Sequence, residues 1–256
     1  MFLRLTGLTI ILALLTACGD DSAKESAPAV EKPVNILLRY KIDERGVDPY
    51  ETTFVITNKF IRIDDDDNPR NFVLIDRKAE VVYSVADEND AILVVNKMPV
   101  DLEPPMEIKL SEQKVEEDNV PRIDGKEAIQ YVFEANGLFC YQAVVAEGLL
   151  PEATKALQQY LGMLAGQHAS TMKTVPADQI TACDLSMHIF NPGRHLKHGL
   201  PVREWDGKSF RRQLIEYDNE YEVPEGIFEL PEEFGRFTIQ DMLGSAPELS
   251  ESAAPK

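Results

Sequence analysis

The sequence is poor in the residues that most often build catalytic and metal centres. Its 256 residues include three cysteines, four histidines and one tryptophan. It also contains no G-x-S-x-G, H-E-x-x-H or G-x-G-x-x-G motif and no phosphate-binding Walker loop. A catalytic triad can be scattered along a chain, so these absences do not exclude one. We expect a protein that is not an enzyme and that uses no cofactor.

Positive charge is also scarce. Lysine and arginine total 26 against 44 aspartates and glutamates, and the formal net charge is -18. A nucleic-acid partner is excluded, because its phosphates require a surplus of basic residues. Hydrophobic residues make up 44% and charged residues 27%, which is typical of a globular protein and not of a disordered chain.

Long hydrophobic runs are absent as well. The uncharged stretch over residues 5–15 follows the basic Arg4, but a membrane-spanning helix needs about 20 apolar residues. A basic start followed by a short apolar stretch is typical of a secretory signal peptide. We therefore predict that residues 1–17 are an export signal.

The next residues are Leu15-Thr16-Ala17-Cys18. They resemble the lipobox of bacterial lipoproteins, in which the cysteine thiol receives a diacylglycerol, the signal is cut before it, and the new amine is acylated. The resemblance implies that fatty acids such as palmitate on Cys18 anchor the chain, since two or more acyl chains hold a protein stably at a membrane. The alternative is an ordinary secretory signal with a chance cysteine.

The residue after Cys18 bears on the location. In the lipoprotein family an aspartate there favours the inner membrane, whereas this sequence has Gly19. The expected location is therefore the bacterial cell envelope, at the periplasmic face of the outer membrane, with the inner membrane as the alternative. An acidic chain is not attracted to anionic lipid, so the N-terminal lipid anchor would have to hold it there.

Composition divides the rest of the chain. Residues 18–34 are rich in alanine, serine, proline and charge, which is typical of a flexible tether. Residues 35–243 carry the apolar patterns of a folded domain, and residues 244–256 have the composition of a disordered tail.

Most of the folded domain has the pattern of short β-strands. The expected strands cover residues 36–42, 53–63, 72–76, 81–85, 91–95, 107–110, 128–134, 138–145, 184–190, 209–217 and 227–230. Several breaks are too short to hold a crossover helix, so antiparallel pairing is expected. Trp205 is expected in a polar turn, either as part of a contact surface or packed in the core.

One amphipathic helix is expected over residues 150–166, where apolar residues recur at helical spacing behind Pro151. Gly162 and Gly166 would either allow close packing or loosen the helix end. A sheet with an embedded helix predicts an α+β fold.

A second resemblance rests on the run FVITNKFIRIDDDDNPRNFVLIDRKAEVVYSV, residues 54–85. It resembles the repeated hairpins of periplasmic lipoprotein-carrier (LolA/LolB-like) proteins, and HGLPVREWDGKSF and VPEGIFELPEEF resemble closing strands of related periplasmic proteins. The resemblance implies a strongly curved, half-barrel-like sheet, mostly antiparallel, with one or more helices packed on it. In that family the concave face holds acyl chains.

Two cysteines remain besides Cys18. Cys140 and Cys183 form an even pair in an oxidising compartment, so a disulfide is expected, and two free thiols that bind a metal are the alternative.

The histidines offer a second metal hypothesis. His188, His195 and His198 follow Cys183 closely and could bind copper or zinc. Nearby cations disfavour a metal ion, so solvated loop histidines and no metal are expected.

Three functions remain open at this point. The first is a lipid-anchored periplasmic binding protein that holds an acyl chain, a lipid or an apolar peptide in a curved-sheet cavity. The second is a non-enzymatic structural or accessory lipoprotein with an envelope protein partner. The third is a metal-handling lipoprotein. The sequence identifies no ligand-binding residues.

Overall fold

The computed structural model describes residues 33–65, 68–115 and 121–244. The predicted signal peptide, Cys18, most of the tether and most of the C-terminal tail lie outside these residues. In the described part of the chain, no helix combines the length and the apolar character that crossing a membrane requires.

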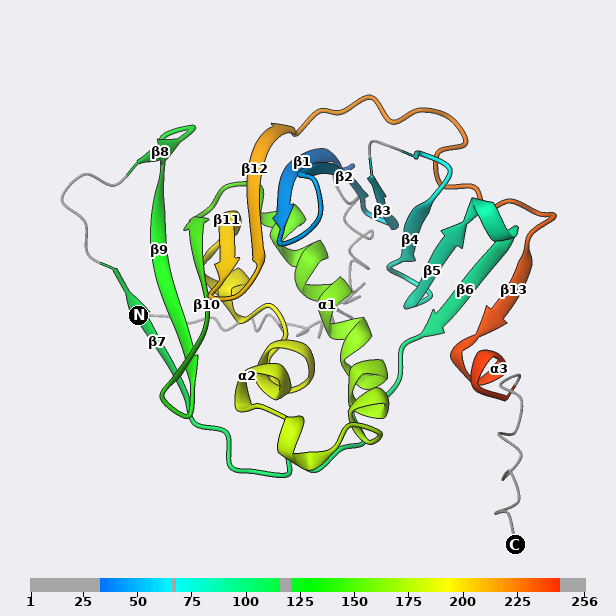
Figure 1. The fold of residues 1–256 in the computed structure, drawn as a ribbon. Helices are drawn as coiled ribbons and strands as arrows, with labels where there is room; N and C mark the ends of the chain where they lie inside the picture. Colours follow the sequence, from blue (N-terminus) through cyan, green and yellow to red (C-terminus); the bar gives the residue numbers. More distant parts are fainter. Residues whose placement is uncertain (1–32, 66–67, 116–120, 245–256) are drawn as a thin grey trace, which may run out of the picture. The chain divides into compact units, whose positions relative to one another are not determined.

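The strands form one large open sheet (Figure 1). Its strands are β1 (Asn35–Glu44), β2 (Tyr50–Thr57), β3 (Phe60–Asp65), β4 (Phe72–Asp76), β5 (Val81–Ala86), β6 (Ala91–Asn96), β7 (Leu110–Lys114), β8 (Arg122–Ile123), β9 (Lys126–Ala135), β10 (Leu138–Ala146), β11 (Leu200–Asp206), β12 (Phe210–Asp218) and β13 (Gly235–Thr238). Their order is β13-β6-β5-β4-β3-β2-β1-β12-β11-β10-β9-β7, and β8 pairs with β9. Among the described strands, only β13 and β6 pair in parallel.

The helices are few. They are α1 (Pro151–Met172), α2 (Ala182–Leu185) and α3 (Ile239–Gly244), with short helical turns η1 (Asp87–Asn89), η2 (Ala177–Gln179), η3 (Ser186–Phe190) and η4 (Arg194–His198). A large, mostly antiparallel sheet with few helices agrees with the expected α+β class. The helix expected over residues 150–166 exists and continues to Met172.

Side-chain caps correct two expectations about turns. The single strand expected over residues 53–63 is wrong, because the Thr57 hydroxyl accepts the backbone N–H groups of Lys59 and Phe60 at 3.3 and 2.9 Å and turns the chain between β2 and β3. Trp205 lies within β11 and not in a turn. The turn begins at Asp206, whose carboxylate accepts three successive backbone N–H groups.

One face of the sheet, called here the helix-covered face, packs against α1. Strand residues such as Leu38, Ile56 and Ile75 meet Leu157 and Met163 of the helix in one buried cluster. Full burial of each such side chain contributes about 1.5–3 kcal/mol. The alternating pattern of the strands and the helical period of α1 therefore meet in the main core.

The opposite face of β3 to β6 is covered by the segment between β12 and β13 (Figure 1, orange). The strand expected over residues 227–230 is wrong, because residues 227 and 228 lie in a turn and residues 229 and 230 have no regular secondary structure. Buried Arg62 holds this segment by donating from Nη1 to the Ile227 carbonyl at 2.6 Å, while its Cζ lies 3.6 Å from the Phe72 ring centroid. The Phe228 ring stacks on Phe60 at 5.1 Å.

The strand expected over residues 184–190 is also wrong, because these residues form the end of α2 and η3. Thr181 caps α2 by accepting the Asp184 N–H at 3.1 Å, and Leu185 and Ile189 share one helical face in a buried cluster. A disulfide joins Cys140 of β10 to Cys183 of α2, the pairing that was expected. It fastens the helical segment to the sheet.

Candidate functional site

The basic turn η4 is held between α1 and the sheet. It is preceded by Gly193, which has a φ of +62°, and a Cβ there would lie 2.7 Å from the side chain of Leu161. Glycine therefore suits both the backbone conformation and the close approach to α1. This turn presents Arg194, His195 and Lys197 to strands that are far away in the sequence.

His195 is buried, so the expectation of a solvated loop histidine is wrong for it. Its side chain lies between Tyr141 of β10, with 3.2 Å between the hydroxyl and Nδ1, and Glu204 of β11, with 3.0 Å between Nε2 and Oε1. The second contact is an ion-pair distance without hydrogen-bond geometry. His195 thus links η4 to two strands.

Glu204 also pairs with Arg212 on the neighbouring strand β12. Arg212 donates from Nε at 2.8 Å, and its Nη2 bonds the same carboxylate oxygen. Burial alone would raise the pKa of Glu204, but the charges of Arg212 and His195 outweigh it and hold that pKa well below the ordinary value. The carboxylate is therefore ionised, and it serves as a structural counter-ion inside the domain.

A second carboxylate, Glu112 of edge strand β7, faces the end of η4. Lys197 Nζ lies 2.7 Å from Oε2, and His198 Nε2 lies 3.2 Å from Oε1. Burial opposes ionisation of Glu112, but the hydrogen bond and charge of Lys197 lower its pKa overall. His198 stacks on Tyr131 with 4.0 Å between ring centroids, and burial lowers the pKa of the imidazole.

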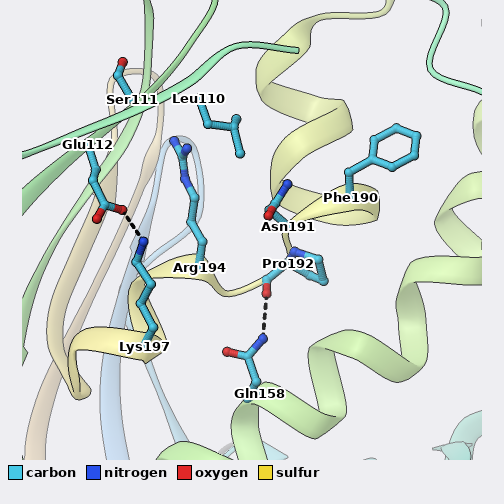
Figure 2. A pocket seen from close by; sticks show the side chains of 9 residues that line it. All are labelled: Leu110, Ser111, Glu112, Gln158, Phe190, Asn191, Pro192, Arg194 and Lys197. Carbon is cyan, nitrogen blue, oxygen red and sulfur yellow. Dashed lines mark hydrogen bonds and ion pairs between the residues drawn. The ribbon is translucent and has the colours of Figure 1, made fainter. Parts of the chain in front are cut away.

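A pocket of about 470 Å³ opens between β7, η4 and α1 (Figure 2). It is lined by Leu110, Ser111, Glu112, Gln158, Phe190, Asn191, Pro192, Arg194 and Lys197. Its size is that of a ligand or side-chain site, and it combines a few charged groups with apolar walls.

Arg194 is a cation of this pocket that contacts strands β9 and β10. Its Nη2 donates to the Glu134 carbonyl of β9 at 2.9 Å, and its Cζ lies 5.0 and 5.9 Å from the ring centroids of Phe133 and Tyr141. Contacts with a carbonyl and two aromatic rings fix the guanidinium and reduce the entropy that it loses when an anion binds.

The structure does not bring the three suggested metal ligands together. His188 lies beside His168, with 5.3 Å between ring centroids, while His195 and His198 face the carboxylates of β11 and β7. Within the described residues, no group of three or more histidine, cysteine, aspartate or glutamate side chains could hold a metal ion.

Sequence reasoning missed Arg194, Glu112 and the Glu204–Arg212 pair as members of a site. Glu204 and Arg212 lie directly opposite each other in the β11–β12 register. Recognising β11 and its hairpin turn would have paired their opposite charges, but Glu112 and Arg194 come together only through tertiary packing.

No family model matches the chain, and no curated protein sequence matches it. Solved structures with a similar chain path include an uncharacterized conserved protein from Thermus thermophilus, with 8% identity and a TM-score of 0.41 over 79% of this chain and 90% of that chain. Two crystal forms of PNGF-II have 11% and 9% identity and TM-scores of 0.39 and 0.40, over 83% and 82% of this chain and 33% and 32% of theirs. Likenesses of this size carry no conclusion about function.

Proposed function

We propose that this chain is a lipid-anchored, non-enzymatic accessory protein of the bacterial envelope, and that its domain binds a protein partner. The proposal takes the Cys18 lipid as the anchor and the sheet as a half-barrel-like surface curved around α1. The observation that carries it is the filled helix-covered face, where α1 residues such as Leu157 and Met163 pack directly on the strands.

That packing favours a protein partner over an acyl chain on this face. In lipoprotein carriers the concave face of the sheet holds the acyl chain, whereas side chains of α1 fill the helix-covered face of this sheet. The charged pocket at Arg194 and Lys197 lies instead beside the sheet edge, where a partner chain can reach it.

A second candidate function is the binding of an acyl chain or an apolar peptide in another pocket. A pocket of about 450 Å³ between β6, α1 and α3 has apolar residues, including Val94, Val95, Met98 and Ile239, in its lining. This lining is the observation that favours a lipid-binding role.

Two measurements on the native host separate these functions. Chemical cross-linking in intact cells, with the adduct identified by mass spectrometry and repeated from the partner's side, is expected to give one dominant protein adduct. Native mass spectrometry of the purified chain is expected to show no lipid beyond the N-terminal anchor. A bound lipid without a cross-linked partner would reject the accessory role and support the second candidate.

A further inference from the structure

We propose that the free edge of β7, together with the adjoining Arg194–Lys197 pocket, binds an extended acidic segment of a partner protein as an added β-strand. This inference deepens the proposed function by naming the contact site and the chemistry of the partner segment. It rests on three features: the backbone groups of β7 that point away from the sheet, the charge beside this strand, and the adjoining pocket.

Two backbone hydrogen bonds show which groups of β7 point toward β9 and which point away from it. Asn136 N–H donates to the Lys109 carbonyl at 2.8 Å, and Val115 N–H donates to the Gln130 carbonyl at 2.9 Å. Together with the antiparallel register of β7 and β9, these contacts show that the backbone N–H and C=O groups of residues 109, 111, 113 and 115 point toward β9. The backbone groups of Leu110, Glu112 and Lys114 point away from it.

In the described part of the chain, β7 is the last strand at this end of the sheet. All five of its residues are exposed. An unpaired row of N–H and C=O groups on an exposed edge accepts another extended chain, which gains affinity from main-chain hydrogen bonds.

The side chains beside this edge set the charge of the added strand. Leu110, Glu112 and Lys114 alternate onto the face that carries Phe133 and Arg194. The pocket beside this edge is lined by two cations, Arg194 and Lys197, and by one carboxylate, Glu112, in a chain whose net charge is -18. Since Glu112 is already paired with Lys197, the local excess is positive and favours an acidic side chain.

The pocket gives such a side chain a place to bind. Arg194 is fixed by Glu134 and the aromatic rings of β9 and β10, and Leu110 and Phe190 supply apolar walls (Figure 2). A glutamate of the added strand would accept hydrogen bonds from Arg194 or Lys197. β-Branched residues on either side of this glutamate would favour the extended conformation that adds a strand to the sheet.

The test uses the full chain in detergent and a fluorescent blocked peptide, acetyl-Thr-Val-Glu-Val-Thr-amide, with matched peptides that carry glutamine or lysine in place of glutamate. Binding is measured by fluorescence anisotropy. The glutamate peptide is expected to bind about tenfold tighter than the glutamine peptide, a difference typical of a hydrogen bond to a charged group, and the lysine peptide weakest of the three.

Variants locate the site. Arg194→Gln and Lys197→Gln are expected to weaken the glutamate peptide about tenfold, and Lys114→Pro, which removes an outward N–H and leaves the β9 ladder intact, is expected to abolish binding. Arg203→Gln, an exposed arginine of β11, is the matched control and should bind normally. If Lys114→Pro fails to fold, the two charge variants still decide the matter.

Equal binding of the three peptides, no binding at millimolar concentration, or equal effects of Arg194→Gln and Arg203→Gln would overturn this inference. None of these results would reject the proposed function, because a cross-linked partner could still bind elsewhere on the domain. Conversely, peptide binding at β7 without a cellular partner would reject only the accessory role.

Discussion

Arg212 and Glu204 form an ion pair where the two halves of the sheet join. Arg212 Nε lies 2.8 Å from Glu204 Oε2 across β11 and β12, and the Arg212 guanidinium lies 4.7 Å from the ring centroid of Tyr40 on β1. Strand β1 pairs with β12. This contact therefore links the half of the sheet that contains β1 to β6 with the half that contains β7 to β12. It therefore bears on the stability of the whole sheet.

The first prediction concerns loss of this pair. Glu204→Gln leaves the partly buried Arg212 guanidinium without its counter-ion, so the free energy of unfolding should fall by about 1.5–3 kcal/mol. Urea unfolding measures it. The matched control is Glu216→Gln, which breaks the exposed pair with Arg39 and should cost less than about 1 kcal/mol. Equal losses in the two variants would contradict the structural role given to Glu204.

The second prediction concerns acid. Glu204 has a folded-state pKa below its ordinary value of 4.5, so its stabilising contribution is complete above that pH and is lost as the pH falls toward the folded-state pKa. The difference in unfolding free energy between wild type and Glu204→Gln should shrink as the pH falls below the ordinary glutamate pKa, because the unfolded state then binds a proton that the folded state does not. Urea titrations at several pH values measure this difference. A gap that does not narrow in acid would show that the carboxylate is not stabilised in the fold.

The third prediction compares the two glycines of α1. A Cβ on Gly166 would lie 2.1 Å from the Met98 carbonyl oxygen, whereas a Cβ on Gly162 would have no heavy atom within 4 Å. Gly166→Ala should destabilise the domain by about 1–3 kcal/mol through overpacking. Gly162→Ala, its matched control, should stabilise it by up to about 1 kcal/mol, because alanine favours the helix. Thermal unfolding of both variants measures the contrast, and two changes of the same sign would contradict the close approach of α1 to Met98.

The fourth prediction concerns the Cys140–Cys183 disulfide. It closes a loop with a sequence separation of 43, and the chain-entropy model assigns such a loop about 4 kcal/mol. The Cys140→Ser/Cys183→Ser variant should therefore lose about that much unfolding free energy. Reducing agent should lower the stability of the wild type and leave the variant unchanged; a reductant-sensitive variant would mean that the effect does not come from this bond.

The sequence predicted elements whose pattern is local. The strand expected over residues 72–76 coincides with β4, and those expected near residues 81 and 91 are one residue shorter than β5 and β6. Alternating apolar residues and polar breaks suffice there. The helix behind Pro151 was found by the same reasoning, although its last six residues lie beyond the expected end.

The errors arose where tertiary contacts override local propensity. The apolar residues over 184–190 indicate a strand, but the Thr181 cap and the disulfide at Cys183 hold them in a helical segment beside β10. Residues 227–230 also have a strand-like composition, but the Ile227 carbonyl accepts a hydrogen bond from the Arg62 side chain instead of from a neighbouring strand. The burial of His195 could not be read from its basic neighbours, because Glu204 and Tyr141 reach it only through the fold.

We propose that acyl groups on Cys18 hold this domain at a membrane. The most direct measurement is membrane fractionation of wild type and Cys18→Ser, together with the intact mass of each N-terminus. The account predicts that the wild type sediments with membranes as an acylated chain that begins at Cys18, and that the variant retains residues 1–17 and carries no acyl mass. Unmodified N-termini of equal length and the same distribution for both proteins would contradict it.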